Sequence, residues 1–151
     1  MFNNRKVKFI KSNLGMCIYL DDCLFKNNKN KKIINVLKLF SVEKLNIKCI
    51  CYVENDNIFL EKLKVILKDS YEVVFKKKQT KIQFNIQGSK LDELITLSIK
   101  HEILIDAICY DNNEIVMQLI VNDNDGSCII FNTKKYDLEM IKKNTLLIVK
   151  D

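Results

Sequence analysis

The chain alternates polar and apolar residues without a break over Lys81-Ile-Gln-Phe-Asn-Ile-Gln87. Successive side chains of an extended strand point to opposite faces, so Ile82, Phe84 and Ile86 share one face and their polar neighbours share the other. Such a strand has one face in the core and one toward water, as is common in antiparallel sheets. The stretch therefore predicts an antiparallel sheet that is covered on one side.

The sequence that precedes this strand predicts a second strand over 46–54. Alternation there places Ile47, Cys49, Cys51 and Val53 on one face. We expect this face to lie in the core, because its four side chains are all apolar or thiol groups.

Apolar residues recur at helical spacing elsewhere, and Asn and Asp residues mark the turns, since the chain has no proline and only three glycines. The predicted helices are 31–41, 57–69, 90–101 and 137–143. The predicted strands are 5–11, 15–20, 46–54, 71–78, 80–87, 103–110, 114–121, 127–133 and 145–150. Polar residues at the helix starts predict N-caps at Asn30, the Asn55-Asp-Asn57 turn, Ser89 and Asp137.

The order of elements from about 46 to 110 is β-α-β-β-α-β, which is the order of ferredoxin-like folds. The later strands would extend the same antiparallel sheet as C-terminal hairpins, with the helices mainly on one face. We therefore expect an α+β fold, and a single domain over 1–151, because neither a linker nor a repeat interrupts the chain. The order by itself assigns no function.

Composition indicates a folded protein of a reducing compartment. Hydrophobic residues make up 48% of the 151 residues and charged residues 29%, and no apolar run approaches the roughly 20 residues of a membrane helix. The N-terminus lacks the pattern of a secretory signal, so we expect a cytoplasmic location and no membrane partner. The six cysteines are then interpreted as buried free thiols rather than disulfides.

The net charge of +6 is weak evidence for a nucleic-acid partner. The basic residues are lysines apart from Arg5, and arginine is the residue that makes most bidentate contacts to phosphates and bases. Lysine, asparagine and isoleucine codons are also favoured by AT-rich genomes.

No combination of residues in the sequence matches a known catalytic or metal-binding motif, so we expect no cofactor. Cys49 and Cys51 share a strand face, but a structural zinc needs four ligands and His101 is the only histidine. The Asn122-Asp-Asn-Asp-Gly126 stretch lacks the flanking acids of a calcium loop and is interpreted as a hairpin turn. His101 is expected to end a helix, and Asp21-Asp22-Cys23 is interpreted as a solvated turn.

A mixed sheet face is the best candidate for binding a partner. The face opposite the predicted helices combines tyrosines, amides and lysines, as protein interfaces often do. Either this face is exposed, or residues 1–41 pack over it. The candidate partner-binding residues are Lys48, Tyr52, Lys76, Gln83, Asn85 and Tyr110.

Three hypotheses for function follow. The first is a non-enzymatic protein-binding module, such as an immunity or inhibitor protein that neutralises a partner. The second is an RNA-binding domain that uses Tyr52, Tyr110 and the lysines of the sheet face. The third is an enzyme with an unrecognised site that involves Asp21, Asp22, Cys23 or His101.

Overall fold

The computed structural model describes residues 16–19, 29–54, 56–68, 71–76, 79–123, 126–137, 139 and 149–150. Within them the protein is a mixed α+β fold, as predicted, with an antiparallel sheet and three α-helices. The helices are α1 (Lys29–Leu39), α2 (Asn57–Leu67) and α3 (Leu91–His101). The strands are β1 (Met16–Tyr19), β2 (Asn46–Val53), β3 (Tyr71–Lys76), β4 (Gln79–Gln87), β5 (Leu104–Asp111), β6 (Glu114–Asp123), β7 (Gly126–Phe131) and β8 (Val149–Lys150).

The strands follow the order β3-β4-β2-β5-β6-β7-β1-β8 across the sheet, and each paired neighbour is antiparallel. β2 lies between β4 and β5, with Cys49 opposite both Phe84 and Ala107. β4, which contains the alternating stretch 81–87, is thus paired on both sides, by β3 and β2.

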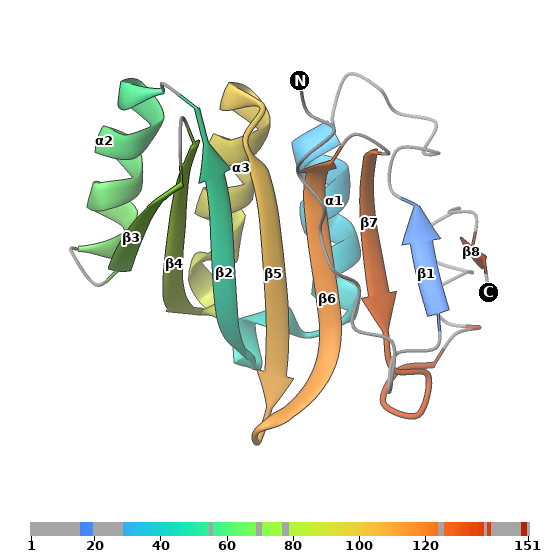
Figure 1. Ribbon diagram of the computed structural model, residues 1–151. Coiled ribbons are helices and arrows are strands. Elements are labelled where there is room, and N and C mark those ends of the chain that lie inside the picture. Colours follow the sequence, from blue (N-terminus) through green and yellow to red (C-terminus); the bar gives the residue numbers. More distant parts are fainter. Residues whose placement is uncertain are drawn as a thin grey trace.

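All three helices lie on the same side of the sheet (Figure 1). α1 buries Ile33, Val36 and Leu37 against the sheet, together with Phe40 just beyond its end. The Phe40 ring packs edge-on against Phe131 of β7, with ring centroids 5.1 Å apart. One hydrophobic core therefore fills the layer between the helices and the sheet.

Two helix starts differ from the predictions. α1 begins at Lys29, so Asn30 lies inside the helix instead of capping it. Helical hydrogen bonding extends into the lysine-rich stretch because lysine is a good helix former. Ser89 belongs to a short 3₁₀ turn, η4 (Gly88–Lys90), and gives α3 no side-chain cap.

Tertiary contact explains the 3₁₀ turn. The Gly88 N–H donates to the Leu45 carbonyl at 2.9 Å, and a Cβ at Gly88 would lie 1.6 Å from the carbonyl oxygen of Val42. The backbone therefore passes η3 (Val42–Lys44) so closely before α3 begins that only a residue without a side chain fits at position 88.

The cap of α2 is where the sequence places it. Asp56 precedes the helix, and its Oδ1 accepts the Phe59 N–H at 2.8 Å. The Glu139 N–H likewise donates to Asp137 Oδ1 at 3.0 Å, while most of the helix predicted over 137–143 lies outside the described residues. The strand predicted over 5–11 also lies outside them. No helix in the described ranges has the length and apolarity needed to cross a membrane.

Candidate functional site

The register of three strands brings most of the predicted partner-binding residues onto one face. Because antiparallel partners point their side chains to the same side, β4, β2 and β5 form transverse rows on the face turned away from the helices. The rows, in order along β2, are Gln87-Asn46-Tyr110, Asn85-Lys48-Ile108, Gln83-Ile50-Asp106 and Lys81-Tyr52-Leu104.

The first two rows form an open polar depression. Lys48 and Asn85 are exposed and Tyr110 is partly exposed. The depression has a volume of about 370 Å³, at the small end of the range of roughly 300–1,000 Å³ for small-molecule sites. It is lined by Asn46, Ile47, Lys48, Asn85, Ile86, Gln87 and Tyr110. Its size and openness suit one or two side chains of a partner better than an enclosed cofactor.

A bulge shapes the edge of this depression. The pairing of β5 with β6 shifts by one position between Cys109 and Tyr110. The hairpin then turns through Asn112 and Asn113, which both have positive φ, at 50° and 69°. Two left-handed residues give a turn whose twist matches that of the strands. The sequence predicts this hairpin at Asp111-Asn-Asn113, but not the bulge beside Tyr110.

The other half of the same face is buried. Leu104, Ile120 and Cys128 form a second apolar cluster on β5, β6 and β7, and Tyr52 packs against it. Burial, together with the Asp106 carboxylate, raises the pKa of Tyr52.

A polar pair lies within this buried half. Gln118 Nε2 donates to Asp106 Oδ1 at 2.9 Å, and both residues are buried. The sheet face is therefore divided, with an open polar part over the first two rows and a buried part around Asp106, Leu104 and their neighbours on β6 and β7.

The sequence left open whether residues 1–41 cover this face, and the structure describes only part of that segment. Of the segment 1–41, the structure describes mainly β1 and α1. β1 pairs with β7 inside the sheet, and α1 lies on the helix side (Figure 1). Neither of these two elements covers the polar half of the face.

Three of the predicted site residues lie away from the depression, and Tyr52, which packs against the second cluster, is one of them. Gln83 is partly buried in the third row, opposite Ile50. Lys76 ends the edge strand β3 opposite Gln79, beyond the row that contains Tyr52. The site therefore centres on Lys48, Asn85 and Tyr110, and reasoning from sequence missed the amides of Asn46 and Gln87 beside them.

The cysteine thiols belong to the core. Cys49, Cys51 and Cys109 are fully buried on the helix side, as predicted for the first two, and none of them forms a disulfide. Burial raises the pKa of each thiol, that of Cys109 to about 12. Thiols that stay protonated are poor nucleophiles and poor metal ligands. Within the described ranges no group of three His, Cys, Asp or Glu side chains could hold a metal ion.

His101 has an acidic partner that the sequence does not reveal. Its Nδ1 lies 3.0 Å from Asp56 Oδ2, across 45 residues of chain. A histidine oriented by a carboxylate is part of many catalytic sites. Here, however, Nε2 is buried and has no hydrogen-bond partner among the residues described, and Phe59 packs edge-on against the ring. The pair joins the end of α3 to the start of α2, and its free nitrogen does not reach solvent.

The loop compared with a calcium site is used for capping. Asn122 has a φ of 63°, and its Nδ2 donates to the carbonyls of Ser98 and Ile103, each at 3.0 Å. These carbonyls lie at the C-terminal end of α3, where helices leave acceptors without partners. Asn122 therefore ties the β6–β7 hairpin to the helix.

The remaining candidate, Asp21-Asp22-Cys23, lies outside the described residues. Comparisons with protein-family models, with curated proteins and with solved structures found no match to this chain.

Proposed function

We propose that this protein is a non-enzymatic binding module that holds another protein against the polar half of its sheet face. The observation that carries the proposal is the open depression between Lys48, Asn85 and Tyr110. No hydrogen bond or ion pair joins these three side chains to other residues in the described part of the chain, so they are available to a partner. A ring, an amide and an ammonium group offer both contact area and hydrogen bonds, as protein interfaces do.

The charge of the face defines the chemistry of the partner. Lys48 and Lys81 lie on the open side of β2 and β4, whereas Asp106 on the same face is buried against Gln118. The charged residues that β2 and β4 contribute to the open side are therefore lysines, in keeping with the net charge of +6. We infer that the partner carries an acidic patch. More specifically, we propose an immunity or inhibitor role in which the module masks that patch.

The spacing of the two tyrosines favours a protein over RNA. Tyr110 is opposite Asn46, at the other end of β2 from Tyr52. Six residues of strand separate the two positions, which is about 20 Å. Stacking platforms for RNA place aromatic rings side by side on neighbouring strands, and Tyr52 is half-buried against the second cluster.

The detailed topology and the cellular location are also proposals. We infer that residues 46–111 form a ferredoxin-like unit, supported by the element order β2-α2-β3-β4-α3-β5 and the strand order β3-β4-β2-β5. A cytoplasmic location, supported by the cysteine usage, completes the proposal.

The test is affinity capture from the native host with a matched pair of variants. Lys48→Glu reverses a charge inside the depression, and Lys134→Glu reverses an exposed charge in the turn after β7, which does not line the depression. We expect wild type and Lys134→Glu to retain the same partner protein at moderate salt, and Lys48→Glu to retain at least about tenfold less, because a like charge then faces the acidic patch.

Three results would count against the proposal. A partner retained equally by both variants would place the interface elsewhere. Recovery of nucleic acid that dissociates steeply with added salt would favour the RNA hypothesis. Recovery of no partner by the wild-type protein would leave the polar half of the face without a binding role.

A further inference from the structure

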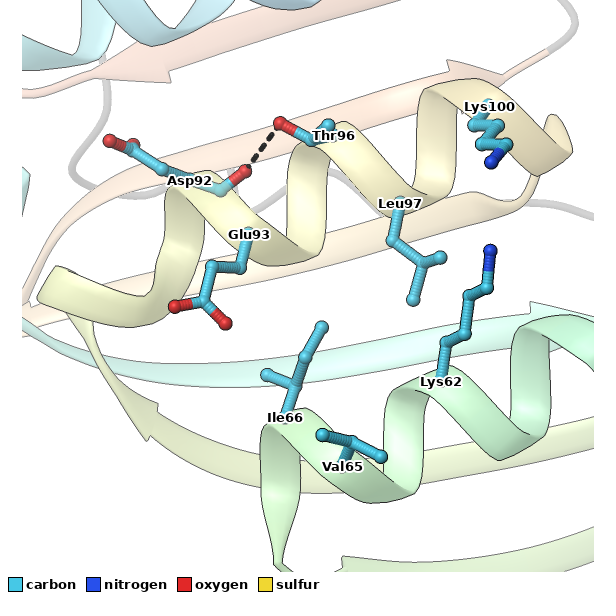
Figure 2. Close-up of a pocket in the computed structure, with 8 residues that line it drawn as sticks. All are labelled: Lys62, Val65, Ile66, Asp92, Glu93, Thr96, Leu97 and Lys100. Carbon is cyan, nitrogen blue, oxygen red and sulfur yellow. Dashed lines mark hydrogen bonds between the residues drawn. The ribbon is translucent and has the colours of Figure 1, made fainter.

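An apolar groove lies between α2 and α3 on the outer surface of the helical layer, remote from the sheet face (Figure 2). Ile66 of α2 and Leu97 of α3 lie at the bottom of the groove, Val65 lies at its exposed edge, and its volume is about 570 Å³. Val65 is 76% exposed, and Ile58, two turns earlier on α2, is 63% exposed. They are the large hydrophobic side chains most exposed to water in the described ranges. Exposed apolar surface of this kind is typical of protein–protein contacts.

The two helices that form the groove are antiparallel. At one end Lys90 Nζ, just before α3, donates to the carbonyl of Ile66 near the end of α2, at 3.4 Å. At the other end His101, the last residue of α3, contacts Asp56, the cap of α2. The start of α3 and the end of α2 therefore form one end of the groove.

The charges at the two ends of the groove are opposite. Asp92 and Glu93 lie at the start of α3, and Lys62 and Lys100 lie at the far end, where their ammonium groups point toward each other (Figure 2). The nearby ammonium group of Lys100 lowers the pKa of Lys62. Within the described ranges no ion pair joins any of these four groups to an opposite charge. These four groups therefore make no direct contact with an opposite charge among the described residues, although Lys90 lies at the acidic end and Asp56 at the lysine end of the groove.

We propose that a second copy of this chain docks on this groove about a two-fold axis, so that the acidic end of each copy faces the lysine end of the other. The axis passes near Val65 and Leu97, midway between the two ends. Seven residues, or about 10 Å of helix, separate Glu93 from Lys100, so one rotation aligns both charge pairs at once. A two-fold interface of this kind is self-complementary and closes as a dimer.

The dimer buries apolar side chains and relieves repulsion in the same step. Val65 packs against the groove floor of the partner copy, and each lysine pair gains a carboxylate counter-charge. The two 11-residue helices are only about 16 Å long, so the interface is smaller than that of an obligate dimer. We therefore expect a dissociation constant on the order of micromolar, weakening as salt screens the charges.

Sedimentation velocity over a concentration series tests the dimer with the full chain. Val65→Glu places two like charges beside the axis and should weaken dimerisation on the order of a hundredfold. Glu93→Lys and Lys100→Glu, measured separately, should each weaken it about tenfold. In a dimer of either variant, position 93 of one copy and position 100 of the other carry the same charge, and this repulsion occurs twice by symmetry.

An equimolar mixture of the two charge variants tests whether complementary charges restore the dimer. In a mixed dimer the lysine introduced at position 93 of one copy faces the glutamate introduced at position 100 of the other, and the unchanged Lys100 faces the unchanged Glu93. We therefore expect the mixture to recover an affinity within about threefold of wild type. Circular dichroism confirms folding of each variant, and Lys134→Glu serves as the charge control with wild-type affinity.

The outcomes separate this proposal from the one for the sheet face. A wild-type protein that stays monomeric up to about 1 mM would overturn it, as would a mixture no tighter than its components. A dimer disrupted by Lys48→Glu but not by Val65→Glu would move self-association to the sheet face and overturn the groove assignment. Loss of the dimer in Val65→Glu, with partner capture unchanged, would support it.

Discussion

At the scale of single residues, the core cysteines determine how the protein responds to alkaline pH. Cys49, Cys51 and Cys109 are buried among the strands, and water cannot solvate their thiolates. Burial raises the pKa of Cys109 from its ordinary value of about 9.0 to about 12. The folded protein therefore keeps a proton that the unfolded chain loses within this range.

The first prediction concerns this difference. Below about pH 9 both states hold the Cys109 proton, so its contribution to stability is complete. Between about pH 9 and 12 only the unfolded chain releases it, so Cys109 should lower the free energy of unfolding by about 1.4 kcal/mol per pH unit, in addition to the contributions of the other buried thiols. Urea denaturation at pH 8 to 11 measures this slope. Cys109→Ala should show a shallower slope, and an identical slope in the variant would contradict the assignment.

At the same scale, Asn122 and His101 act through partners distant in the sequence. Asn122 caps α3 from a hairpin 19 and 24 residues away from its two acceptors, and His101 meets Asp56 across 45 residues. The residue types are those expected of a turn and a helix end. Their partners could not be predicted, because only the packing of α2 against α3 and of the hairpin against α3 brings them within hydrogen-bond distance.

At the scale of elements, the close passage of η4 past η3 controls the start of α3. The second prediction is that Gly88→Ala destabilises the protein by about 3 kcal/mol or more, because its Cβ would lie 1.6 Å from the Val42 carbonyl oxygen and the backbone must move. Ser89→Ala, at the exposed neighbouring position, should change stability by less than about 0.5 kcal/mol. Thermal unfolding of both variants measures the difference, and equal effects would show that the turn tolerates a side chain.

Periodicity predicts the elements of the described core well. β2 starts at the predicted residue and ends one residue early, and α2 starts at the predicted residue. The stripe that contains Phe59, Leu63 and Leu67 is buried as the helical spacing requires. The starts of α1 and α3 are less accurate, because a neighbouring segment or the packed face decides where helical hydrogen bonding begins.

At the scale of the whole molecule, the sheet face turned away from the helices has two parts. Its rows change from exposed amides and lysine at one end to a buried cluster around Leu104 and Ile120 at the other. The buried end contributes to stability, and the polar end is the part that we propose to bind a partner. A binding variant is therefore expected to be tolerated only in the first part.

The third prediction tests this division. Ile120 is fully buried in the second cluster, and Ile108 lies in a partly exposed row of the same face. Ile120→Ala should lower the free energy of unfolding by about 3 kcal/mol, and Ile108→Ala by about 1 kcal/mol, because less apolar contact is lost at the exposed site. Urea denaturation compares them directly. Equal losses, or a smaller loss at Ile120, would show that the face is not divided in this way.

The sequence alone determined which side chains share a strand or helix face, because the periods of 2 and 3.6 residues are local properties of the backbone. The alternation in 46–54 and 81–87 therefore predicted the buried thiols and the polar row of Lys48 and Asn85. The tertiary structure alone decided which rows become adjacent, which part of a face is buried, and which charges meet across two helices. These outcomes depend on strand register and helix packing, which arise from contacts between segments that are far apart in the chain.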